Sequence, residues 1–173
     1  WGVRSKNDHL VKLARMLSRV MVLFAVIGVV SGTLIAIQMS VFWPGLIAFG
    51  HDIIGVPFML EGYAFLIEAV FLALYVSTWD RVRGMKHVLL LIPVILGSFL
   101  SAVCITLVNA WMNDPGGFDF VDGKVANVHV WQGLLTKTAF FEIAHSTVSY
   151  YLATFLCIAG VLLWSIKKKG SGI

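Results

Sequence analysis

The stretch VMVLFAVIGVVSGTLIAIQMSVF, residues 20–42, decides the fold of this protein, because it contains no charged side chain over its whole length. The hydrocarbon core of a bilayer is roughly 30 Å thick, and a helix of about 20 apolar residues crosses it. Residues 20–42 therefore predict a membrane-spanning helix.

Three further stretches have the same length and character. They cover about residues 57–79, 88–111 and 139–164. Tryptophans, which favour the membrane–water interface, lie at the ends of the four predicted spans. These are Trp43, Trp79, Trp111 and Trp164. The pattern predicts four spans, each anchored at an interface.

The composition excludes a soluble protein. Of the 173 residues, 59% are hydrophobic and only 13% are charged, and the mean hydropathy is +0.90. Soluble domains carry about 25% charged residues. We therefore expect an all-α fold, an integral membrane four-helix bundle.

Basic residues gather in three segments that flank the spans. They are Arg4, Lys6, Lys12, Arg15, Arg19, Arg81, Arg83, Lys86, Lys167, Lys168 and Lys169. Loop 44–56 holds none, and the loop before the last span holds only Lys124 and Lys137. The positive-inside rule then predicts that both termini are cytoplasmic and that the protein is a multi-pass protein of the cell inner (cytoplasmic) membrane. The net charge of +4 is explained by these flanks and does not indicate a nucleic-acid partner.

The spans also divide the chain. Residues 1–19 form a basic amphipathic N-terminal arm that we expect to lie along the inner interface. Residues 20–166 form the transmembrane domain, and residues 167–173 form a basic cytoplasmic tail. His51, Asp52 and His87 lie close to the span boundaries and are interpreted as solvated.

Four ionisable residues fall inside the predicted spans: Glu61, Glu68, Glu142 and His145. Charge at this depth costs about 2.5–3.5 kcal/mol on insertion scales, so each residue is a site candidate. Glu61 and Glu68 are seven residues apart and share one helix face. They indicate either a proton path or cofactor site, or two protonated acids bonded to neighbouring helices.

Glu142 and His145 are three residues apart and share a face near the outer end of the last span. A neutral imidazole in an apolar setting is a common axial ligand of haem iron, although a packing role remains the alternative. A di-iron site would need two such pairs and two further glutamates, and the chain has one pair.

The longer motifs resemble a known family. They are GVVSGTLIAIQMSVFW (28–43), GHDIIGVPFMLEGYAFLIEAVFLALYVSTWDR (50–81), HVLLLIPVILGSFLSAVCITLVNAWMNDPGG (87–117) and FFEIAHSTVSYYLATF (140–155). In this order they are similar to the second to fifth transmembrane helices of subunit I of cytochrome bd quinol oxidase. WDR, GSFLSA and NAWMNDP carry the resemblance most specifically.

The resemblance implies roles for particular residues. His145 matches a histidine that ligates haem b, so we expect it to bind the iron. Glu61 and Glu68 match glutamates implicated in haem d ligation and proton delivery, and are the candidate catalytic residues. Further cofactor contacts are expected from Glu142, Trp111, Met112 and Asn113.

By this resemblance, the protein is expected to be a haem-b-binding membrane subunit of a cytochrome bd-like oxidoreductase. It would pass electrons between quinol, or a partner redox centre, and the rest of a respiratory-type complex in the bilayer. A quinone is a second candidate cofactor. We expect a redox subunit of a quinol-linked enzyme and not a complete oxidase on its own, because the family's quinol-binding loop and GRQPW signature do not occur in the sequence.

Two alternatives from other classes remain open. A cofactor-free anchor or assembly subunit could keep WDR and NAWMNDP for packing alone, because a fold does not fix a function. A small channel built on Glu61 and Glu68 would need several copies to enclose a path.

Overall fold

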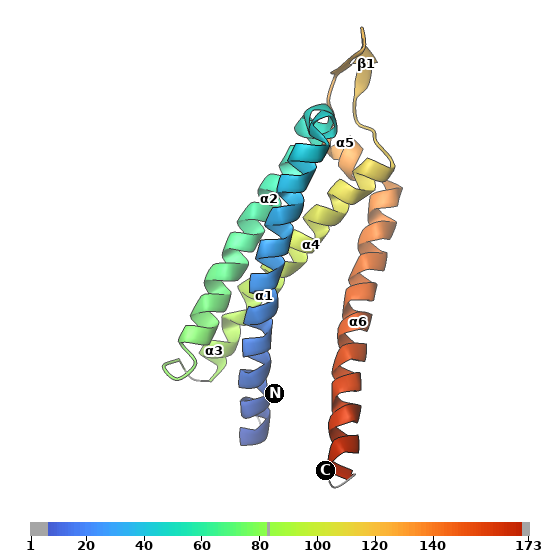
Figure 1. The fold of residues 1–173 in the computed structure, drawn as a ribbon. Helices are drawn as coiled ribbons and strands as arrows, with labels where there is room; N and C mark the ends of the chain where they lie inside the picture. Colours follow the sequence, from blue (N-terminus) through green and yellow to red (C-terminus); the bar gives the residue numbers. More distant parts are fainter. Residues whose placement is uncertain (1–6, 83, 171–173) are drawn as a thin grey trace.

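The computed structural model describes residues 7–82 and 84–170, and these form a helical bundle with a small hairpin at one end (Figure 1). The helices are α1 (Asp8–Phe42), α2 (Pro44–Ser77), α3 (Met85–Leu89), α4 (Leu91–Asn113), α5 (Val130–Leu134) and α6 (Lys137–Gly170), and the strands are β1 (Asp119–Val121) and β2 (Lys124–Ala126). Four helical segments are long and apolar enough to cross a membrane: Asp8–Phe42, Pro44–Ser77, Met85–Asn113 and Lys137–Lys167. The basic residues Arg4, Lys6 and Arg83 lie outside the described residues.

Helix α1 is one uninterrupted helix of 35 residues. Its first turn is capped by Asn7, whose Oδ1 accepts hydrogen bonds from the backbone N–H groups of His9 and Leu10 at 3.0 and 3.2 Å. Residues 8–19, which we expected to lie along the interface as a separate arm, are the first turns of this helix and continue into residues 20–42 without a break.

Only Trp43 separates α1 from α2. Its backbone leaves the helical conformation at φ −128° and ψ 52°, and Pro44 follows as the first residue of α2, where its missing N–H leaves no helical bond unmade. The segment 44–56 was expected to be a loop, and it is helical instead.

The third membrane-spanning segment is broken once, at Leu90, between α3 and α4. Pro93 explains the break, because a proline at this position cannot donate a backbone hydrogen bond to Leu89 four residues earlier. From Leu91 the helix continues to Asn113.

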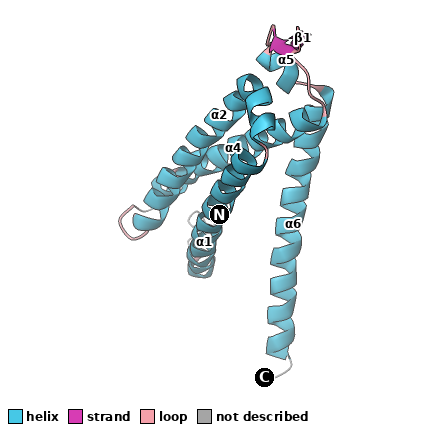
Figure 2. Ribbon diagram, turned by 45° about the horizontal axis from the view of Figure 1, so that its top comes forward, coloured by secondary structure: helices cyan, strands magenta, loops and turns pink. Residues whose placement is uncertain are grey.

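The prediction of a purely α-helical fold omitted one element, the hairpin of β1 and β2 (Figure 2). The strands are antiparallel and pair Asp119 with Ala126 and Val121 with Lys124. Asp122 and Gly123 form the turn with φ values of 50° and 75°. An Asp-Gly pair with both φ angles positive is a preferred two-residue hairpin turn, so the sequence did carry this signal.

The core lies between α2 and α4, which make most of the contacts between helices. The two helices pass close to each other at Gly97 of α4, where a Cβ would lie 2.8 Å from the carbonyl oxygen of Ala64 and 3.2 Å from Cβ of Glu68. A glycine at such a crossing lets two helix backbones meet. By contrast, the most apolar windows of α1 and α6 contain no buried residue.

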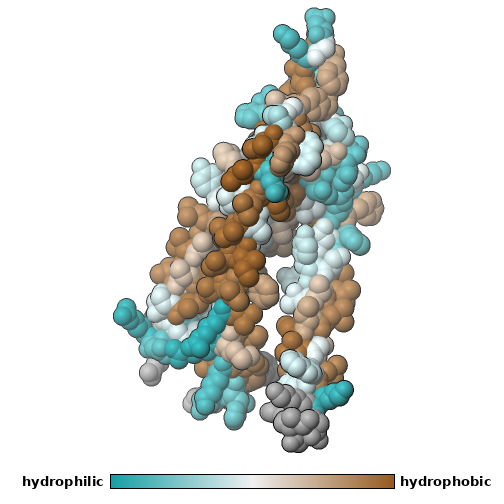
Figure 3. Space-filling view, viewed as in Figure 1, coloured by the Kyte–Doolittle hydropathy of each residue, from teal (hydrophilic) through white to brown (hydrophobic). Residues whose placement is uncertain are grey.

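The surface has the distribution of a membrane protein. Apolar side chains cover the middle of the bundle, and hydrophilic ones gather toward its two ends (Figure 3). The described ends of the chain and the α2–α3 turn lie at one end, and the hairpin with α5 lies at the other (Figure 1).

Candidate functional site

His145 lies on α6 and lines an open hollow between α4 and α6 with a volume of about 530 Å³. Its imidazole is exposed and makes no hydrogen bond to any part of the chain that the structure describes. The other residues lining the hollow are Asn109, Phe141, Glu142 and Ser146. A free imidazole nitrogen beside an open, partly aromatic hollow is available to a metal ion or a cofactor.

Glu142, three residues before His145, faces the same hollow, as this spacing predicts. Its Oε2 accepts a hydrogen bond from Nδ2 of Asn109 at 3.0 Å, and its Oε1 accepts one from Nδ2 of Asn113 at 3.2 Å. The two asparagines are four residues apart and lie on one face of α4. We call Asn109, Asn113 and Glu142 the Glu142 cluster. Both carboxylate oxygens are occupied by amide donors.

Asn109 was not predicted as a site residue. Its contact with Glu142 joins residues 33 positions apart in the chain, and nothing in the local sequence indicates such a pair. The only available signal was an amide side chain inside an apolar span.

Trp111 lies in the protein core, with 2% of its surface exposed. Its ring fills the space above Gly50, where a Cβ would come within 2.8 Å of the indole, and its Nε1–H donates to the carbonyl oxygen of Gly116 at 3.0 Å. Met112 is half-buried and packs against the same core. Neither residue lines the hollow beside His145, whereas Asn113 reaches it through Glu142.

Glu61 lines a second and larger cavity, of about 580 Å³, between α1 and α2. Small residues line this groove, among them Gly28 and Gly32 of α1 and Gly62 of α2, and His51 of α2 lines it too. Within the described part of the chain, Glu61 makes no hydrogen bond through its side chain. The groove thus presents one carboxyl group and one imidazole along a mostly apolar wall.

Glu68 does not line that groove. Its backbone nitrogen and Cβ lie against the helix crossing at Gly97. The structure therefore keeps the four predicted ionisable site residues in three places: Glu61 in the α1–α2 groove, Glu68 at the α2–α4 crossing, and Glu142 with His145 between α4 and α6.

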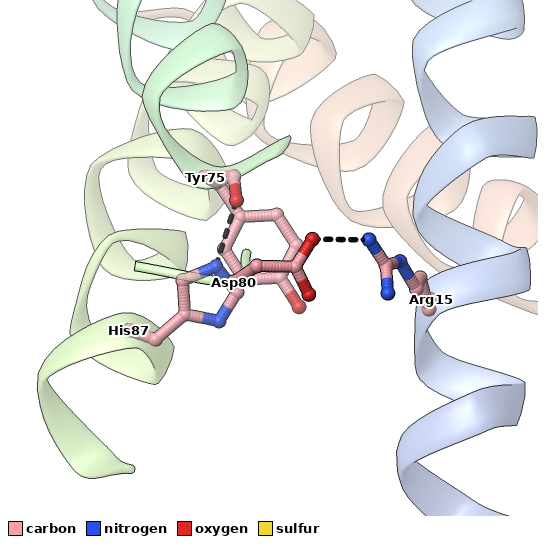
Figure 4. A network of polar contacts seen from close by, with 4 residues as sticks. All are labelled: Arg15, Tyr75, Asp80 and His87. Carbon is pink, nitrogen blue, oxygen red and sulfur yellow. Dashed lines mark hydrogen bonds and ion pairs between the residues drawn. The ribbon is translucent and has the colours of Figure 1, made fainter. Parts of the chain in front are cut away.

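A polar network at the opposite end of the bundle was not predicted (Figure 4). Nη2 of Arg15 on α1 lies 2.6 Å from Oδ2 of Asp80 in the turn after α2, and the same guanidinium lies 5.7 Å from the centre of the Trp79 ring. Trp79 and Asp80 belong to the WDR motif, so this part of the motif holds α1 against the turn.

His87 corrects the expectation of a solvated histidine, because it is buried, with 7% of its surface exposed. Its ring stacks on Tyr75 with centroids 4.3 Å apart, and its Nε2 lies 2.7 Å from the Tyr75 carbonyl oxygen (Figure 4). Aromatic neighbours from α2 and the turn thus enclose the residue, although it lies near a span boundary.

The comparison with known proteins agrees with this architecture. The family model for cytochrome bd terminal oxidase subunit I matches residues 1–172. The chain is 27% identical over 165 residues to the putative cytochrome bd menaquinol oxidase subunit I of Bacillus subtilis, and 28% identical over 166 residues to cytochrome bd ubiquinol oxidase subunit 1 of the same organism. Each match covers 95% of this chain, and it covers 37% of the first relative and 35% of the second.

A solved structure, that of bd oxidase from Geobacillus thermodenitrificans, is similar with a TM-score of 0.78 and 40% sequence identity. The similarity covers 83% of this chain and 34% of that one, so this chain spans roughly a third of the length of the proteins it matches. Four apolar helices and these relatives identify a multi-pass protein of the cell membrane. The chain belongs to the cytochrome bd terminal oxidase subunit I family.

Proposed function

We propose that this chain is a haem-b-binding membrane subunit of a bd-type quinol oxidoreductase, and that His145 would hold the haem iron. The observation that carries the proposal is the imidazole of His145, which lines the hollow between α4 and α6 and makes no hydrogen bond to the described residues. An ionisable residue at membrane depth is costly, so a histidine there without a hydrogen-bond partner is suited to a bound group.

The residues that line the hollow would hold a haem from one side only. The hollow offers an imidazole, the apolar ring of Phe141 and the amide of Asn109. No second histidine and no methionine line the hollow among the described residues, so any further ligand of the iron would come from another part of the complex. When bound, haem accepts and releases single electrons at a potential set by its ligands and surroundings.

The protein's own residues would orient and shield the group. The imidazole of His145 would hold the iron from α6, and the enclosed Trp111 and half-buried Met112 would keep the outer end of α4 rigid behind the hollow. Electrons would pass between quinol, or a partner redox centre, and the rest of a multi-subunit membrane complex. A quinone as an additional cofactor belongs to the same proposal.

We assign Glu61 and Glu68 to proton handling. Glu61 lines an apolar groove with no hydrogen-bond partner from the described residues, and a carboxyl group in such a place can take up and release a proton. Glu68 lies two turns further along the same helix, toward the α2–α3 turn.

We also propose that both termini face the cytoplasm. The described basic residues of α1, of the α2–α3 turn and of the end of α6 gather at one end of the bundle (Figure 1). This is the distribution that the positive-inside rule associates with the cytoplasmic side. The division into an N-terminal arm, a transmembrane domain from residue 20 to 166, and a basic tail rests on the same charges.

The test is a dithionite-reduced minus oxidised absorption spectrum of the detergent-purified protein, isolated with its native partners. A sharp b-type α band is expected, and His145→Ala should abolish it. His129→Ala is the matched control, since it removes an imidazole from the segment between the hairpin and α5 and should leave the band unchanged. A flat spectrum from stable, partner-bound protein would sink the proposal and leave a cofactor-free anchor.

A further inference from the structure

The Glu142 cluster is the last polar connection between α4 and α6, within the described part of the chain, before the two helices separate. One turn closer to the hairpin, Oγ1 of Thr138 donates to Oδ2 of Asp114 at 3.2 Å, and the cluster follows. From Tyr151 to Lys167, every described α6 side chain is exposed. The outer turns of α6 alone fix where the helix lies against α4.

His145 is the residue that this arrangement affects most directly. It follows Glu142 by less than one helical turn and lines the same hollow, with Asn109 on the opposite wall. A change in how α6 rests on α4 would move the imidazole relative to α4.

We propose that Asn109 and Asn113 hold the carboxylate of Glu142 so that α6 presents His145 to the hollow at a fixed angle. Glu142 is then a positioning residue, and neither a ligand nor a proton donor. This inference rests on the proposed function, because the position of His145 matters for activity only if the hollow holds a haem. The separation of the two helices can be measured without haem.

The hydrogen bonding supports this role. An ionised carboxylate accepts on both oxygens, and bonds to a charged acceptor are about twice as strong as neutral ones. Here both oxygens are engaged by amides of one helix, so the carboxylate has two fixed points on α4. A group held in this way has little freedom to turn toward a cofactor.

A series of substitutions distinguishes a positioning role of Glu142 from a direct effect of its negative charge on the haem. In Glu142→Gln, a side-chain amide can still bond both asparagines if Asn113 turns its amide over, so the connection survives without the charge. In Asn113→Asp, two carboxylates face each other, so the bond at position 113 is lost and charge repulsion opposes the remaining bond from Asn109. In the double variant E142Q/N113D, the amide introduced at position 142 donates to the new carboxylate, and its oxygen accepts from Asn109. This double variant restores the bonds with the charge moved to α4.

The first readout is independent of haem. A spin label on the native Cys157 of α6 and another on Leu96→Cys of α4 report the separation of the two helices, in a background where the buried Cys104 is replaced by alanine. The expected result is a native distance distribution for E142Q and E142Q/N113D, and a broadened, shifted one for N113D and Glu142→Ala. Asn127→Asp, which places a second carboxylate beside Asp119 in the hairpin, is the matched control and should leave the distribution native.

The second readout is the amount of haem retained and its midpoint potential. Because a displaced imidazole holds the iron less well, we expect N113D to lose haem and to shift its midpoint potential, and E142Q/N113D to recover both. A native distribution in N113D and E142A would overturn the positioning role, and so would failure of E142Q/N113D to restore it. Loss of haem in E142Q with a native helix distance would show a direct role of the charge and would also overturn it. If no variant or native protein holds haem, the proposed function fails, and the spin-label distances still decide the positioning role.

Discussion

Arg15 and Asp80, 65 residues apart in the chain, form an ion pair with 2.6 Å between Nη2 and Oδ2. The pair ties α1 to the turn between α2 and α3, and Trp79 lies beneath the same guanidinium. Since the most apolar part of α1 has no buried residue, this contact is one of few specific connections between α1 and the rest of the bundle.

The Arg15–Asp80 pair should contribute little to stability. Its side chains are 45% and 74% exposed, and exposed pairs contribute about 0.2–1 kcal/mol. A double-mutant cycle with Arg15→Ala and Asp80→Ala, measured by thermal unfolding in detergent, should give a coupling energy in that range. The coupling should shrink as salt is added, because exposed charges are screened. A salt-independent coupling of several kcal/mol would contradict this view of the pair.

Gly97→Ala should destabilise the α2–α4 pair. The added Cβ would lie 2.8 Å from the carbonyl oxygen of Ala64, so the helices must separate. Overpacking of this kind costs about 1–3 kcal/mol, which denaturant unfolding in mixed micelles would measure. Gly160→Ala on α6 is the control: no atom lies within 4 Å of its added Cβ, and the protein should be as stable as before or slightly more so. Equal effects of the two substitutions would refute the close crossing.

The membrane spans could be predicted because a bilayer demands a fixed length of apolar helix, and residues 20–42 satisfy it without a charge. The helix from Pro44 was missed because the segment 44–56 contains glycines, a proline and polar residues, and Trp43 alone makes the turn. The hairpin was missed although its signal, Asp122-Gly123, is local and strong.

For the candidate site too, the relation between residues of one helix could be predicted from the sequence, and contacts between helices could not. The spacing of Glu142 and His145 predicted a common face, and both line one hollow. Which residues of α4 would meet that face could not be predicted, because Asn109 and Asn113 are brought to Glu142 only by the crossing of two helices. The burial of His87 likewise depends on Tyr75, which lies on another helix.

Trp111 should be the most sensitive core position. Trp111→Ala removes an enclosed indole and should cost about 3–5 kcal/mol. Trp111→Phe keeps most of the volume but leaves the Gly116 carbonyl oxygen without its indole donor, and should cost about 1 kcal/mol. Trp164→Phe, at a position with 71% exposure on α6, should change thermal stability little. A mild effect of Trp111→Ala would mean that the core between α2 and α4 is looser than described.

Gly123→Ala should weaken the hairpin alone. The residue has φ 75°, and a side chain in that conformation costs roughly 1–2 kcal/mol. Limited proteolysis between β1 and β2 should accelerate, while the unfolding of the helices stays the same. Gly116→Ala makes a fair comparison, since its added Cβ has open space and its φ is not among the positive ones. If both variants are cleaved equally fast, the turn conformation is not what protects the hairpin.

The exposure of α6 from Tyr151 to Lys167 also bears on how the protein is made. Helices enter the bilayer in the order in which they are translated, and lateral association follows insertion. The helix pair with the most extensive packing, α2 and α4, is complete before α6 is synthesised. Helix α6 therefore joins a surface that already exists, and it attaches by its first few turns. Helix α1, which is synthesised before α2, makes its ion pair with Asp80 only after α2 and the following turn have emerged from the ribosome.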